Sequence, residues 1–103
     1  MAVLSASTII VKPDRYQDFV ENSRKGKAII EKSGGKNVRL LAGLVAGEAT
    51  GSFVFTFEAD DFADYGVVMG KTMADPEIRS VMSTGTASPT AGYQTSLWVD
   101  VPL

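Results

Sequence analysis

Two kinds of periodicity alternate along the 103-residue chain, and their order limits its fold more than any other feature. Apolar residues recur at helical spacing in two stretches, and β-branched or alternating runs flank them. The order is strand, helix, strand, strand, helix, strand, which is that of the ferredoxin-like α+β fold. The sequence therefore predicts one domain over residues 1–103, with one antiparallel sheet and its helices on a single face. The predicted strands are residues 2–11, 37–46, 52–58 and 93–101.

The first predicted helix carries signals at both ends. Pro13 and Asp14 suit a first helical turn, and the Ser-Gly-Gly of residues 33–35 ends the helical pattern. Gly26 lies inside it, where glycine costs about 1 kcal/mol relative to alanine. Gly26 either weakens the middle of the helix or marks a close packing point.

Carboxylates mark the later helices. Asp60 or Asp61 is placed to cap the second helix, and Asp75 to cap a short third helix that runs to about residue 84. Together with Asp64 the first two resemble a metal cluster, but capping and the helix dipole explain them without an ion. We expect no metal site. The apolar stripe predicted for the second helix comprises Phe62, Tyr65 or Gly66, Met69 and Met73.

The hairpin between the two middle strands sets which residues share a sheet face. A turn centred on Ala49 would place strand partners so that one face packs under the helices and the other stays open. The open face would be a semi-polar cavity wall or a flat dimer contact, and the two interpretations are equally supported. The predicted helix-side set is Leu41, Gly43, Val45, Phe53, Phe55 and Phe57. The predicted open-face set is Leu40, Ala42, Leu44, Ala46, Ser52, Val54, Thr56 and Glu58.

Composition excludes several kinds of site. The chain has no cysteine and no histidine, which removes disulfides, thiolate nucleophiles, Ser-His-Asp triads, histidine-ligated haem and histidine metal sites. Its formal net charge is -2 with a pI near 5.0, which argues against nucleic-acid and anionic-membrane binding. No apolar run approaches the roughly 20 residues that span a bilayer, and the N-terminus lacks a basic signal region. We expect a cytoplasmic location.

The charge is unevenly distributed. Residues 12–39 hold eight Lys or Arg and four acids, or +4, whereas residues 40–103 hold two and eight, or -6. A solvated basic helix face explains this better than a partner-binding patch. The aromatic run Phe53, Phe55 and Phe57 resembles the stacking residues of an RNA-binding sheet, but the acidic pI opposes phosphate binding.

With these elements the chain resembles the dimeric α+β barrel superfamily. The resemblance covers the whole chain and rests on its length, the element order, the aromatic strand after the hairpin, the Ala-Asp-Asp-Phe-Ala-Asp-Tyr of residues 59–65 and the Ala-Asp-Pro-Glu of residues 74–77. It is similar to the antibiotic-monooxygenase, NIPSNAP and stress-responsive branches. The resemblance implies two subunits with their open sheet faces together and a small cavity in each half. It also implies cofactor-independent oxygenases, haem-degrading enzymes, isomerases or cyclases among the relatives. Some of these use a histidine as haem ligand or catalytic base, and this sequence has no residue to match it.

Without histidine or cysteine, acid-base chemistry falls to a carboxylate, tyrosine or lysine with a shifted pKa. Glu58 ends a strand of the predicted open face and Tyr65 is an amphipathic ring, so they are the catalytic candidates. Each has an alternative interpretation as a surface charge or a core ring. The ligand-binding candidates are Arg39, Thr56, Tyr93 and Trp98.

Two functions from different classes follow. In the first, the chain is an enzyme without cofactor, a monooxygenase or isomerase acting on a small apolar or aromatic compound, with Glu58 as base. In the second, it is a non-catalytic binding or assembly module with a filled cavity. An open pocket of roughly 300 Å³ or more would favour the first. In either case we expect a homodimer through the open faces and a mobile flap over residues 85–92.

Overall fold

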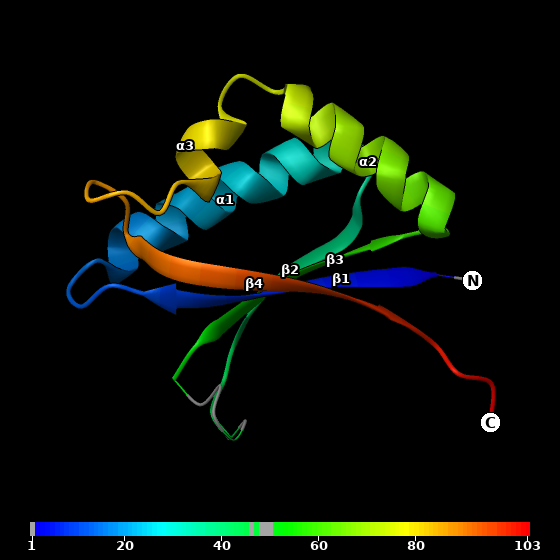
Figure 1. Cartoon of the computed structure of the whole chain (residues 1–103), viewed down its shortest axis with the longest axis horizontal. Coiled ribbons are helices and arrows are strands. Elements are labelled where there is room, and N and C mark those ends of the chain that lie inside the picture. The colour runs from blue at the N-terminus through cyan, green and yellow to red at the C-terminus, as the bar shows by residue number, and fades with distance from the viewer. Residues whose placement is uncertain (1, 46, 48–50) are drawn as a thin grey trace.

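A computed structural model describes residues 2–45, 47 and 51–103. Its strands and helices follow one another in the predicted order (Figure 1). Ala46 and Ala49, which the expected hairpin used, lie outside the described residues. The elements are β1 (Val3–Val11), α1 (Tyr16–Lys32), β2 (Lys36–Ala42), β3 (Phe53–Ala59), α2 (Phe62–Ala74), α3 (Ile78–Met82) and β4 (Thr90–Val99).

The four strands form one antiparallel sheet in the order β2-β3-β1-β4. The described helices α1, α2 and α3 all lie on the same side of it, and none of them covers the opposite face (Figure 1). The ferredoxin-like α+β prediction is therefore confirmed. The two outer strands, β2 and β4, each have one neighbour, so one backbone edge of each is unpaired within this sheet.

The start of α1 differs from the prediction, whereas its end agrees. The helix begins at Tyr16 rather than at Pro13, because the backbone N–H of Lys12 still pairs with the carbonyl of Pro89 at 2.8 Å and Asp14 turns the chain with a φ of 62°. At the other end Ser33 is the cap, and Gly34 takes a φ of 105°, a conformation that glycine adopts without steric cost.

The cap of α2 is the one predicted, and its buried face agrees with the prediction only at Tyr65 and Met69. The carboxylate of Asp61 accepts a hydrogen bond from the backbone N–H of Asp64 at 2.7 Å. Val68 and Thr72 are the buried residues of α2, whereas Phe62 is 70% and Met73 56% exposed. The helix is thus rotated from the expected stripe, because Val68 and Thr72 lie one position before Met69 and Met73, while Tyr65 and Met69 still pack against the core.

The third helix is shorter than predicted. It begins at Ile78, with Glu77 as its N-cap residue, and it ends at Met82. Asp75 instead ends α2, where its carboxylate accepts from the backbone N–H of Glu77 at 2.9 Å and pairs with Lys32 at 2.9 Å. These contacts hold the turn between the two helices.

The strand register corrects the predicted faces of β2. Leu40 pairs with Phe55 and Leu41 with Val54, whereas the sequence predicted that Leu40 would face Glu58. From Arg39 to Ala42 the shift is by an odd number of residues, so each of these β2 side chains changes face. The β3 assignment is confirmed, because Phe53 packs against Phe19 of α1 at 5.2 Å between ring centroids. Leu40 and Ala42 therefore lie on the helix side, with Leu41 and Arg39 on the open face.

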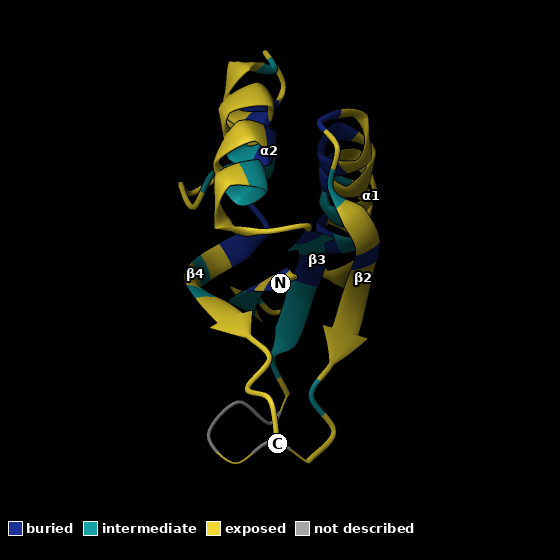
Figure 2. Ribbon diagram, turned by 90° about the vertical axis from the view of Figure 1, so that its right-hand side faces the viewer, coloured by how far each residue is buried: buried dark blue, intermediate teal, exposed yellow. Residues whose placement is uncertain are grey.

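The core lies between the helices and the sheet, where buried residues concentrate (Figure 2). Ile30 of α1, Val38 of β2, Phe57 of β3 and Val68 of α2 form its buried cluster. Gly26 is a close packing point, since a Cβ there would lie 3.3 Å from Cγ1 of Val81. The side chains of the core do not fill all the space under the helices, and the candidate site lies in the space that remains.

Candidate ligand-binding site

A cavity of about 130 Å³ lies between the helices and the helix side of the sheet. Its apolar wall comes from every helix and from the three strands β1, β3 and β4, with Phe19, Phe55 and Met69 among its residues. Hydroxyls and one amide are set into that wall. The polar lining residues are Ser5, Ser7, Asn22, Ser23, Tyr65, Thr72, Thr90, Tyr93 and Thr95.

No lysine, arginine, aspartate or glutamate is among the described residues that line this cavity. A charged ligand group would lose its hydration there without gaining an ionic partner, which costs several kcal/mol or more. A neutral ligand meets no such cost, and hydroxyls can donate or accept toward its oxygen atoms. The cavity therefore fits an uncharged, mostly apolar molecule with a few polar atoms.

The hydroxyl groups of the cavity differ in how they are bonded. Ser7 and Thr95 lie on neighbouring strands and share a hydrogen bond of 2.7 Å. Thr72 is 1% exposed, and its hydroxyl has no hydrogen-bond partner among the described residues. A buried hydroxyl without a partner loses its bonds to water on folding and gains none in return.

The size of the cavity lies between the two sequence expectations. It is smaller than the roughly 300 Å³ expected of an enzyme pocket, yet the space under the helices is not filled. An apolar cavity of about 150 Å³ is enough to bind benzene. A single aromatic ring is therefore the scale of ligand that this space fits as it stands.

The structure divides the sequence-predicted site residues between the two sides of the sheet. Tyr65, on α2, and Tyr93, on β4, both line the cavity. Tyr65 stacks on Phe57 with 5.9 Å between ring centroids, and Tyr93 is 43% exposed. Two of the six candidates are thus brought together.

Arg39, Thr56, Glu58 and Trp98 do not line this cavity. They gather on the open face, where Arg39 pairs with Thr56 across β2 and β3. Glu58 accepts a hydrogen bond from the side-chain amide of Asn37 at 2.6 Å, and Trp98 donates its indole N–H to Ser96 at 2.9 Å. The cavity found in the described chain lies under the helices, on the opposite side of the sheet from the open face that the sequence analysis proposed as a cavity wall.

Sequence reasoning missed most of the polar lining. Asn22 is the example with a usable signal, because it lies three residues after Phe19 and four before Gly26, on the stripe of α1 that faces the sheet. Ser5 and Ser7 alternate along β1 with the same spacing as the buried Val3. In α1 and in β1 alike, the signal is a polar residue at a position that the periodicity of the element assigns to its buried face.

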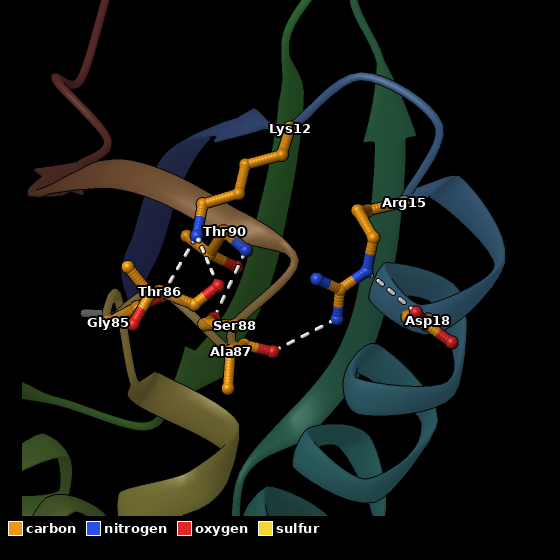
Figure 3. Close-up of polar contacts among 8 residues, drawn as sticks. All are labelled: Lys12, Arg15, Asp18, Gly85, Thr86, Ala87, Ser88 and Thr90. Carbon is orange, nitrogen blue, oxygen red and sulfur yellow. Dashed lines mark hydrogen bonds and ion pairs between the residues drawn. The ribbon is translucent and has the colours of Figure 1, made fainter.

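The loop before β4 connects two cavity-lining elements and is held by two cations (Figure 3). The ammonium of Lys12 donates to the carbonyl of Gly85 at 2.8 Å, and the guanidinium of Arg15 donates to that of Ala87 at 3.0 Å. Ser88 and Thr90 are buried. These polar contacts anchor the segment that the sequence predicts as a mobile flap, and β4 begins at Thr90 rather than at residue 93.

Outside the cavity, one residue in each of two ion pairs has a shifted pKa: Lys36, which pairs with Asp60, and Asp75, which pairs with Lys32. A hydrogen bond and charge attraction from Asp60 raise the pKa of Lys36. The backbone N–H of Glu77 and then the Lys32 side chain lower the pKa of Asp75.

Within the described part of the chain, no group of three or more acidic side chains is arranged to hold a metal ion. None of the described helices is long and apolar enough to cross a membrane.

Comparison with known proteins places the fold. No family model and no curated protein matches the chain. Among solved structures, it is similar to a NIPSNAP family protein from Agrobacterium tumefaciens, with a TM-score of 0.75 and 10% identity over 97% of this chain and 86% of that one. The chain has the subunit fold of the dimeric α+β barrel proteins.

Two further structures with this fold are named as oxygenases. A putative antibiotic biosynthesis monooxygenase from Bordetella bronchiseptica has a TM-score of 0.71 and 16% identity, over 98% of each chain. The cofactor-independent oxygenase SnoaB from Streptomyces nogalater has a TM-score of 0.69 and 14% identity, over 99% of this chain and 95% of its own. The likeness to the NIPSNAP and antibiotic-monooxygenase branches is therefore confirmed at the level of the fold.

Proposed function

We propose that the chain is an enzyme that oxidises a small, neutral, electron-rich aromatic compound with molecular oxygen and without a cofactor. The observation that carries this proposal is the charge-free cavity under the helices, with its apolar wall and its ring of hydroxyls. Oxygenases with the same fold support the choice of reaction. A hydroquinone is the substrate class that best fits a space on the scale of one ring.

Binding follows from the lining. Burying one aromatic ring against Phe19, Phe55 and Met69 removes apolar surface from water at about 25 cal/mol per Å². The amide of Asn22 and the hydroxyls of Tyr65 and Tyr93 are the groups that hydrogen-bond to the oxygen atoms of the ring. An anionic analogue such as benzoate binds less well, because no cation in the lining compensates for the water it loses.

The reaction needs little from the protein beyond binding and exclusion of water. A hydroquinone and one O₂ give a hydroxyquinone and one water, so that one oxygen atom stays on the ring and the other leaves. The ring supplies the electrons once a phenolic proton is lost. Turnover rises with pH as the phenolic substrate loses its proton, and the hydroxyls of Tyr65 and Tyr93 are groups of the described lining that can accept a hydrogen bond from it. Glu58, which the sequence analysis proposed as the base, lies on the other face of the sheet and does not line the cavity.

The alternative is a binding module that performs no reaction. The small volume of the cavity favours it, since about 130 Å³ lies below the roughly 300 Å³ from which ligand pockets usually range. The two functions share a ligand class and differ in one readout. Binding without oxygen consumption identifies the module, and binding with stoichiometric oxygen consumption identifies the enzyme.

The experiment begins with thermal stabilisation by hydroquinone, phenol, toluene and benzoate, and continues with oxygen uptake for each compound that binds. We expect hydroquinone to raise the midpoint of unfolding and benzoate to leave it unchanged. Tyr65→Phe and Tyr93→Phe, which keep the ring and remove the hydroxyl, should lower uptake, whereas Glu58→Gln should not. Stabilisation by benzoate alone, or by none of the four, would refute a neutral aromatic ligand.

A further inference from the structure

A second hollow, of about 400 Å³, lies outside the core between α1 and β2. We name it the β2 edge groove. Four consecutive residues of β2, Val38 to Leu41, line one wall. Successive side chains of a strand point to opposite faces, so four in a row can line one hollow only where it runs along the edge of the strand. The groove therefore follows the backbone of β2.

That edge is open for pairing. β2 is the outer strand of the sheet, and β3 occupies its other side. The backbone N–H and C=O groups that point away from β3 are thus without a strand partner in this sheet, which is the arrangement to which an extended segment adds. Four residues of strand extend about 13 Å at roughly 3.3 Å each, enough for a comparable stretch of a partner.

The opposite wall is one face of α1. Val20, Ser23, Arg24 and Lys27 recur at helical spacing and all line the groove. Together with Leu40 and Phe55, Val20 makes the floor apolar. A partner segment would thus find apolar contacts below and unpaired backbone at one side.

Charge distinguishes the groove from the cavity. Three cations line it, Arg24 and Lys27 from α1 and Arg39 from β2, and no acidic residue is among the described lining. Arg24 pairs with Glu21 on its own helix, whereas Lys27 and Arg39 have no ion pair within the described residues. Arg39 points to the open face of the sheet and Lys27 comes from the helix side, so positive charge flanks the edge on both sides.

We propose that the β2 edge groove binds an acidic segment of a partner protein, in extended conformation, as an added strand beside β2. Backbone pairing holds the segment, and carboxylates toward Arg39 and Lys27 select it. Alternate residues of an extended chain point to opposite sides, so two consecutive acids place one carboxylate on each. Two β2 edges do not pair with each other, because that would oppose the cations of both copies. The proposal is independent of the reaction in the cavity.

The test uses labelled eight-residue peptides and fluorescence anisotropy with the whole protein. The first peptide combines valine and threonine with two consecutive central glutamates. The second has glutamines in their place, and the third keeps the glutamates but carries N-methyl groups at alternate residues, which removes strand pairing along one edge. We expect the first to bind at least about tenfold more tightly than either of the others, with affinity that falls as salt rises.

Charge-reversal variants locate the site. Arg39→Glu and Lys27→Glu lie on exposed positions and should each weaken the glutamate peptide about tenfold. Lys71→Glu, exposed on α2 outside the groove, makes the same change in net charge and should alter affinity less than about twofold. Equal binding of the N-methylated peptide, equal loss in Lys71→Glu, or no binding of any peptide at millimolar concentration would overturn the proposal. In the last case the cations of this edge serve to keep other strands away.

Discussion

Thr72 places a hydroxyl in the cavity at a cost to the stability of the folded chain. Its hydroxyl is buried without a partner among the described residues, and valine has the same shape and a similar helix propensity. We predict that Thr72→Val raises the free energy of unfolding by about 1 kcal/mol, measured by chemical denaturation of the ligand-free protein.

The matched control for Thr72 is Thr95→Val, in the same cavity. The hydroxyl of Thr95 already shares a hydrogen bond with Ser7 at 2.7 Å, so its removal should bring no gain in stability. If Thr72→Val destabilises the protein instead, its hydroxyl has a partner in solution, such as an ordered water, and the description of Thr72 as an unpartnered buried hydroxyl is wrong.

Asp75 gives a prediction for pH. Its pKa is lowered in the folded chain by the backbone N–H of Glu77 and by Lys32. A lowered folded pKa means that the carboxylate stabilises the fold above its unfolded pKa, near 3.9, and that this contribution is lost as pH falls through the folded pKa. Asp75→Asn should therefore be less stable than the natural chain at pH 6, with the difference shrinking below pH 4. An equal difference in denaturation midpoint at both pH values would contradict this.

At the scale of elements, the sequence predicted the order of strands and helices because each element carries its own local pattern. The register of β2 against β3 was beyond its reach, since a shift of an odd number of residues leaves both local patterns intact while exchanging the faces of β2. The rotation of α2 was missed for a similar reason, because Phe62 and Met73 are as apolar as the residues that are buried. Tyr65 and Tyr93 could be chosen from residue chemistry, but the cavity depends on how large side chains leave space under the helices, which no local pattern records.

The loop before β4 is held by contacts between elements that are distant in sequence. Lys12 and Arg15 reach its carbonyls from the turn after β1, and both contacts span more than 70 residues. We predict that Arg15→Ala raises the rate of amide hydrogen exchange over residues 85–89, while leaving the core of β1 and β3 protected. Lys25→Ala, exposed on α1, is the control. Unchanged exchange in Arg15→Ala would show that the buried Ser88 and Thr90 suffice to hold the segment.

At the scale of the whole molecule, helices cover one face of the sheet, and none of the described helices covers the other (Figure 1). Leu4 and Leu41 on that open face are 38% and 37% exposed, and Trp98 is 59% exposed. Around them lie Glu58 and Arg39, so the surface is mixed rather than wholly apolar. A face of this kind suits a contact between two whole subunits, whose centre is apolar and whose rim is polar.

We predict a homodimer through the open faces, because each leucine or tryptophan removed from water there contributes about 2 kcal/mol to association. Sedimentation velocity at tens of micromolar should give twice the 11.0 kDa chain mass. Leu41→Glu places a charge on this face and should shift the protein to monomer without unfolding it, since Leu41 is exposed in the single chain. Val67→Glu, on the outer surface of α2, makes the same chemical change at a position that is 54% exposed and should leave the dimer intact. A natural chain that sediments as a folded monomer would exclude this dimer, whereas dissociation by Val67→Glu alone would place the contact on the helices instead.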